Sequence, residues 1–231
     1  MDICFADKVT NPVHVRLYIM SDIAELERVI QLTEKFEDEI AQLFQSSKFG
    51  NDNKSVAILT TYSIANEHAL AIRELTRLRL LTSAMAILRL QFEAVVKQLW
   101  IFYIASDVAI NKLVAPLTSE NEQAANNSLP TCTIMLNEIE KKGPAGLYRH
   151  LSEFKENSWR PLNSFVHTGI HAVNMHRAGY PATLMSSVIK QSNNLTNMTV
   201  IALAELLKDG DLIKSVATLY KKHSECLQLS I

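Results

Sequence analysis

Apolar residues recur along most of this chain at the three- and four-residue spacing that is typical of an amphipathic α-helix. The spacing predicts a first helix that opens near Ser21 and Asp22 and ends by Gly50, with Glu25 three residues after Asp22 as in a capping box. Its apolar positions are Ile23, Leu26, Val29, Ile30, Leu32, Phe36, Ile40, Leu43 and Phe44. After a polar turn, the same pattern predicts a second long helix over residues 54–76.

A third helix, predicted over residues 82–105, is apolar around nearly its whole circumference. One side carries Leu81, Met85, Leu88, Phe92, Val95, Leu99 and Tyr103, and the other carries Ile87, Leu90, Ala94 and Ile101. Such a helix is buried at the centre of a bundle or shared between a core and a subunit interface. Arg89 and Glu93 lie on its flank, and we expect them to be partnered because an isolated buried charge is costly.

The rest of the chain is also predicted to be helical. Residues 107–145 read as short helices and loops, Gly179 and Gly210 act as helix stops, and longer helices are expected over 147–157, 161–177, 181–207 and 211–227. Only six glycines and six prolines occur among 231 residues, whereas a sheet protein needs frequent turns. The predicted fold class is therefore all-α, an antiparallel helical bundle in a single domain over residues 1–231, with a loosely ordered start over residues 1–20.

Charge is unevenly distributed, although the net charge is only −1. Acidic residues dominate the segment 21–45 and basic residues dominate 68–103, so these two segments are expected to pair helix with helix. The most apolar segment, residues 80–105, carries Arg89, Glu93 and Lys97 in its middle, which does not suit a membrane span. The beginning of the chain does not resemble a secretory signal, so a cytoplasmic protein is expected.

The segment 158–171 carries the most informative polar residues. Laid on one helix, Arg160, Asn163, His167, His171 and Asn174 fall within about 80° of each other, provided that the helix continues through Gly169. One interpretation is an RNA- or nucleotide-directed site, in which Arg160 holds a phosphate and His167 acts as general acid or base. The other is a polar helix surface whose histidines cap neighbouring helices.

Two further pairs are candidates for the same site. Arg89 and Glu93 either form a structural ion pair or reach the polar face of the 160s helix and complete one site with it. Asn193 and Asn194 are further candidates to face that helix. His167 and His171 have a spacing that would chelate a metal, but no Asp or Glu lies nearby. We therefore predict no metal site and no cofactor. The phosphate-binding glycine loops and the usual hydrolase motifs are absent from the sequence.

Two parts of the chain resemble a bacterial family of uncharacterised helical proteins. The first is the run from Ser83 to Trp100, SAMAILRLQFEAVVKQLW, and the second combines LNSFVHTGIH at 162–171 with Gly-Tyr-Pro at 179–181. The resemblance extends over roughly residues 66–207. More distantly, the pattern is similar to the HEPN superfamily of helical bundles, many of which are metal-independent ribonucleases of toxin, abortive-infection and antiviral systems.

The HEPN resemblance implies a homodimer in which two arginine–histidine motifs meet across the interface. Here Arg160 and His167 correspond to that motif. Active members usually have a polar residue directly after the arginine, where this chain has Pro161, and Asn163 is the candidate to replace it. Arg160, Asn163 and His167 are then the catalytic candidates, while Arg89, Glu93, His171 and Asn174 are binding candidates. The expected partners are RNA and an antitoxin or another protein; the alternative function is a non-catalytic helical module that binds a partner protein or a small ligand.

Overall fold

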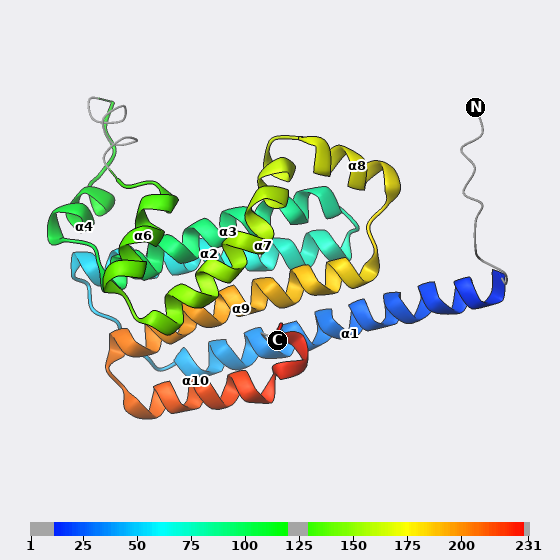
Figure 1. Cartoon of the computed structure of the whole chain (residues 1–231). Coiled ribbons are helices and arrows are strands. Elements are labelled where there is room, and N and C mark those ends of the chain that lie inside the picture. Colours follow the sequence, from blue (N-terminus) through cyan, green and yellow to red (C-terminus); the bar gives the residue numbers. More distant parts are fainter. Residues whose placement is uncertain (1–11, 120–128, 229–231) are drawn as a thin grey trace.

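A computed structural model describes the backbone of residues 12–119 and 129–228 and the side chains from Asp22 onward. Within these ranges the chain is helical and contains no strand (Figure 1). The helices are α1 (Pro12–Phe44), α2 (Asn53–Arg77), α3 (Leu81–Tyr103), α4 (Asp107–Val114), α6 (Cys132–Lys142), α7 (Ala145–Val166), α8 (Ile170–Ala178), α9 (Ala182–Leu207) and α10 (Gly210–Lys222), followed by the 3-10 turn η1 (Ser224–Cys226). The prediction of an all-α fold is confirmed.

Most predicted boundaries agree with these helices, but several differ, among them the next three. Helix α1 begins at Pro12 rather than near Ser21, and residues 1–11 of the expected loose start lie outside the described residues. The predicted break before Pro161 is wrong, because α7 passes through this proline. Gly210 does not end a helix: α9 ends at Leu207 and is capped by Lys208, which has a left-handed backbone (φ 55°), and Gly210 is the first residue of α10.

Helix α3 lies at the centre of the bundle, as its apolar circumference predicted. Its buried residues point in several directions, and the helix packs against α2, α6, α7 and α9. Helices α2 and α3 are antiparallel neighbours joined by the short turn at residues 78–80, as expected for consecutive helices of a bundle (Figure 1). Despite the apolar character of α3, none of the helices in the described ranges combines the length and the hydropathy required to cross a membrane.

Helix α1 packs mainly on α9, far along the chain, and these two helices run in the same direction (Figure 1). Leu26, Val29 and Ile30 of α1 belong to the main core, while a second cluster joins the later part of α1 to α9, α10 and η1. A buried polar contact links the same elements. The Asn193 side-chain amide donates to the Thr33 hydroxyl at 2.8 Å and to the Cys226 carbonyl at 2.8 Å.

Ion pairs connect the acidic helix α1 with the basic end of α2, as the charge distribution predicted. Arg73 is 2.7 Å from Glu34 and 3.1 Å from Glu37, and Arg77 is 2.7 Å from Glu34. The Glu37 side chain is only 16% exposed. This burial raises the pKa of Glu37 from 4.5 to about 7, although the positive charge of Arg73 opposes the shift. One carboxyl of this network therefore titrates near neutral pH.

Candidate functional site

Helix α7 carries the three catalytic candidates on its solvent side. Leu162 and Phe165 are buried against the core, whereas Arg160, Asn163 and His167 are exposed. His167 is the residue that ends the helix, and its N–H donates to the Asn163 carbonyl at 3.2 Å. Because a helix rises about 1.5 Å per residue, Arg160 and His167 are about 10 Å apart along the axis, with Asn163 between them. An extended arginine side chain spans most of that distance.

Pro161 lies inside α7 without ending it. A proline has no N–H, so the carbonyl of Asn157 one turn earlier loses its helical hydrogen bond. Asn157 is exposed, which allows water to satisfy this carbonyl. The helix therefore continues from the core-facing Trp159 to the exposed His167 without a break, and the whole Arg160–Asn163–His167 set is carried by one rigid element.

A tight turn after His167 separates the remaining candidates from α7. Thr168 has a positive φ of 53°, and the Gly169 N–H donates to the Ser164 carbonyl at 2.6 Å. The Ser164 hydroxyl accepts a hydrogen bond from the His171 N–H at 3.0 Å and so holds the start of α8. The interpretation that five polar residues share one continuous helix is therefore wrong: His171 lies on α8, as does Asn174, where it accepts from Arg177 at 3.3 Å.

Helix α8 adds residues that the sequence analysis did not select. The hydroxyl of Thr82, at the start of α3, lies 3.0 Å from His176 Nδ1 and 2.8 Å from the Tyr180 hydroxyl. Between α3 and α8 lies a cavity of about 480 Å³, lined by Thr82, Thr168, Ala172, Val173, His176 and Arg177. Thr168, which lines this cavity, directly follows His167 in the chain.

The chain contains no acidic residue from the second half of α7, through α8, to near the end of α9. No Asp or Glu occurs between Glu156 and Glu205. The same stretch contains Arg160, His167, His171, His176, Arg177 and Lys190. We call the exposed part of this stretch, formed by Arg160, Asn163, His167, His171, His176 and Arg177, the α7–α8 surface. The absence of Asp and Glu from this stretch is visible in the sequence and could have identified His176 and Arg177 as candidates.

Arg89 and Glu93 form an ion pair at the interface of α3 and α7. Arg89 is 9% exposed, and its guanidinium carbon lies 3.0 Å from the centre of the Trp159 ring, in a cation–π arrangement. Phe92 stacks on Phe154 at 4.5 Å and meets Trp159 edge-on at 5.8 Å. Among the described residues, no hydrogen bond or ion pair joins Arg89 or Glu93 to Arg160, Asn163 or His167. The structural interpretation of this pair accounts for all of its contacts.

Two other polar groups lie away from the α7–α8 surface. Asn193 is buried against Thr33 and Cys226, and Asn194 donates to the Gln228 carbonyl at 2.8 Å, so the expectation that these amides face the 160s helix is wrong.

Burial, together with the negative charge of Glu93, raises the pKa of Cys132 to about 11. This thiol is therefore protonated near neutral pH and is a poor nucleophile there.

Within the described residues, the chain is all-helical and exposes arginine and histidine side chains on two adjacent helices, in a stretch of sequence that contains no Asp or Glu. The chain belongs to the family described as a family of unknown function (DUF6988), whose model matches residues 62–229 and so includes every candidate site residue. This membership confirms the expected relation to a family without an assigned function. No curated protein and no solved structure matches the chain.

Proposed function

We propose that this protein is an RNA-directed, HEPN-like protein of a bacterial defence or toxin type that cleaves RNA without a metal ion. The observation that carries the proposal is the α7–α8 surface, to which residues 157–204 contribute no carboxylate, and on which Arg160, Asn163 and His167 are exposed and bear no side-chain ion pair within the described residues. Affinity for RNA comes largely from phosphate contacts, and carboxylates would oppose them. A local basic surface supplies what the near-neutral net charge of the whole chain does not.

The roles of the three residues follow from their chemistry. Arg160 stabilises the charge that develops on the scissile phosphate, because its guanidinium keeps its charge and presents a fork of donors. His167 takes the proton from the ribose 2′-hydroxyl, or returns one to the leaving oxygen, since imidazole exchanges protons near neutral pH. Asn163, one turn before His167 on the same helix, orients one of these partners. His171 and Asn174 on α8 extend the surface along the RNA backbone.

A homodimer would complete such a site by placing two copies of the surface in one cleft. Exposed apolar residues border it: Val166 is 39% exposed, Val173 53% and Ile170 73%. Apolar side chains grouped beside a polar site are typical of surfaces that bind another protein. Contact between two copies through these residues would bring their His167 side chains towards each other.

The experiment that tests the proposal is incubation of cytoplasmic bacterial RNA with the purified protein in EDTA. We expect cleavage by the wild type and by His150→Ala, which removes another exposed histidine of α7, but not by His167→Ala. Circular dichroism should show the same helical content in all three proteins, because both side chains are exposed. Cleavage by His167→Ala at the wild-type rate, or no cleavage by any of the proteins, would refute the proposal.

A second function is favoured by a different observation. A cavity lined mostly by charged and hydroxyl-bearing residues lies between α1, α9 and the C-terminal turn, and its lining shares no residue with the α7–α8 surface. This cavity supports the alternative of a helical module that binds a small ligand, with or without ribonuclease activity at the other surface.

A further inference from the structure

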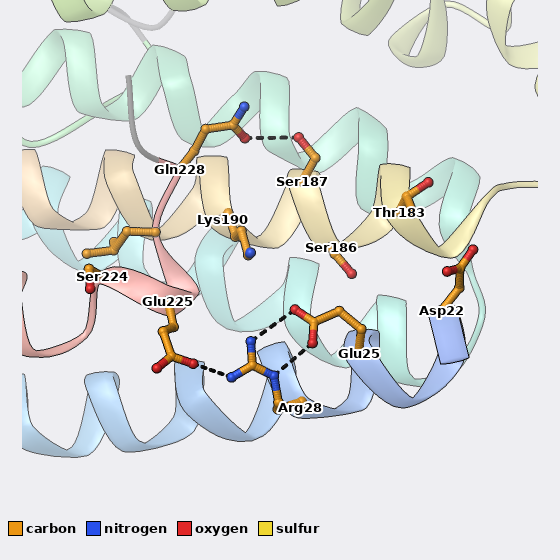
Figure 2. Close-up of a pocket in the computed structure, with 11 residues that line it drawn as sticks. Asp22, Glu25, Arg28, Thr183, Ser186, Ser187, Lys190, Ser224, Glu225 and Gln228 are labelled. Carbon is orange, nitrogen blue, oxygen red and sulfur yellow. Dashed lines mark hydrogen bonds and ion pairs between the residues drawn. The ribbon is translucent and has the colours of Figure 1, made fainter. Parts of the chain in front are cut away.

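The cavity between α1, α9 and η1 has a volume of about 610 Å³, which is within the range of small-molecule sites. Figure 2 shows side chains from three segments converging on it: Asp22, Glu25 and Arg28 from α1, Ser186 and Lys190 from α9, and Glu225 from η1. These segments are far apart in sequence, so the cavity exists only in the folded chain.

Helix α9 presents a polar stripe to this cavity. Thr183, Ser186, Ser187 and Lys190 are spaced by three, one and three residues, which places them on one side of the helix, and all four line the cavity (Figure 2). A helix side that faces a neighbouring helix is ordinarily apolar, because burial of apolar area stabilises the contact. A hydroxyl-rich side that ends in an ammonium group fits a polar occupant better than direct packing.

The Ser186 hydroxyl is a polar group without a partner. The residue is only 7% exposed, and its Oγ makes no hydrogen bond within the described part of the chain. Figure 2 shows the side chain directed toward Glu25 and Arg28, into the gap between α9 and α1. A buried donor left unpaired destabilises the folded state, so a ligand that accepts from this hydroxyl would recover that cost. Ser187 differs, since its Oγ lies 2.9 Å from Gln228 Oε1.

Around the cavity, one cation and one anion form no ion pair with a described side chain. Arg28 pairs with Glu25 at 2.7 Å and also with Glu225, so these three groups satisfy one another. The hydrogen bond from Arg28 lowers the pKa of Glu25, and the charge of Lys190 adds to this effect. Neither Lys190 nor Asp22 forms a hydrogen bond or ion pair with any described side chain. Asp22 lies near Thr183 and Lys190 near Arg28, at different ends of the cavity (Figure 2).

We propose that this cavity binds a small zwitterion of short-peptide type, with its carboxylate at Lys190 and the Ser186 hydroxyl and its ammonium group at Asp22. A simple anion would meet three carboxylates, and a simple cation would meet Lys190 and Arg28, whereas a zwitterion complements both free charges. An extended dipeptide spans about 7 Å between its ends. The stripe from Thr183 to Lys190 covers about 10 Å along the helix axis, and the side chains that extend into the cavity shorten the span left for a ligand. This span suits a dipeptide better than a single amino acid.

Calorimetric titration of the whole chain with glycylglycine and with a panel of glycine-containing dipeptides tests this assignment. We expect saturable binding by wild type that falls at least about tenfold in Lys190→Met and in Asp22→Asn, as loss of a charged hydrogen bond predicts. N-acetylglycylglycine lacks the ammonium group and glycylglycinamide lacks the carboxylate, so both should bind weakly. Lys214→Met, which removes an exposed lysine of α10, should bind like wild type.

Ser186→Ala separates ligand binding from a structural role of the hydroxyl. Removal of an unpaired buried hydroxyl should leave the Tm of the free protein unchanged or raised, and yet should weaken dipeptide binding. The proposal is overturned if no dipeptide of the panel binds, if N-acetylglycylglycine binds as well as glycylglycine, or if Lys190→Met binds normally. Because His167→Ala should retain dipeptide binding, failure of the ribonuclease proposal would leave this result unaffected.

Discussion

The raised pKa of Glu37 makes the stability of the α1–α2 contact depend on pH. In the unfolded chain this carboxyl ionises around 4.5, but in the folded protein it does so at about 7. Between these values the unfolded state has already lost the proton that the folded state keeps, so ionisation favours unfolding as the pH rises. The free energy of unfolding should therefore fall from about pH 4.5 to about pH 7 through this group and should change no further above it.

The size of the effect follows from the shift. One pKa unit corresponds to about 1.4 kcal/mol, so a shift of roughly two and a half units is worth up to about 3 kcal/mol at pH 8. Glu37→Gln keeps the shape of the side chain and an oxygen that accepts from Arg73, but it carries no charge. We expect this variant to be more stable than wild type at about pH 8 and to differ little from it at about pH 5.

Urea unfolding followed by circular dichroism, at several pH values between these limits, measures the difference in free energy between variant and wild type. Glu34→Gln is the matched control: it also removes a partner of Arg73, but its side chain is 40% exposed, compared with 16% for Glu37. The control should not become progressively more stable than wild type as the pH rises. If Glu37→Gln is no more stable than wild type at pH 8, or if its advantage does not depend on pH, burial does not raise the pKa of this carboxyl.

Two further predictions concern α3 and the α7–α8 turn. Glu93→Ala removes the carboxylate that pairs with the buried Arg89, and we expect the free energy of unfolding in urea to fall by about 2 kcal/mol. The double variant Arg89→Met with Glu93→Gln removes both charges and should lose less. Equal losses in the two proteins would contradict a paired buried charge. Gly169→Ala places a Cβ 2.6 Å from the Ser164 hydroxyl that holds α8, so this variant should lower Tm by several degrees. Gly146→Ala is the control, because nothing lies within 4 Å of its added Cβ, and its Tm should not fall. Equal Tm changes in the two variants would contradict the clash.

The long helices could be predicted because their apolar residues dominate the packing. Helix α3 was placed at the bundle centre from its sequence, since an apolar side chain on every side has to be covered. The pairing of α1 with α2 also followed from opposite charges at helical spacing. Such features depend on composition and period within a single segment, which a sequence displays directly.

The local breaks near the site could not be predicted in the same way. Pro161 suggested a helix start, but the exposed carbonyl that it leaves free costs little, and α7 continues. The true break depends on Ser164, whose hydroxyl binds the His171 N–H across a turn. The cavity between α1, α9 and η1 could not be predicted, because Arg28, Lys190 and Glu225 come together only through the packing of these three elements.

The packing of α1 on α9 has a consequence for how the chain folds during synthesis. Leu26, Val29 and Ile30 leave the ribosome early, but the helix that covers much of their side of α1 is encoded more than a hundred residues later. The contact from Asn193 to Thr33 and Cys226 forms only when nearly the whole chain has been made. Until then the apolar side of α1 is available to chaperones or to other nascent chains, so aggregation during expression should be sensitive to polar substitutions on that side.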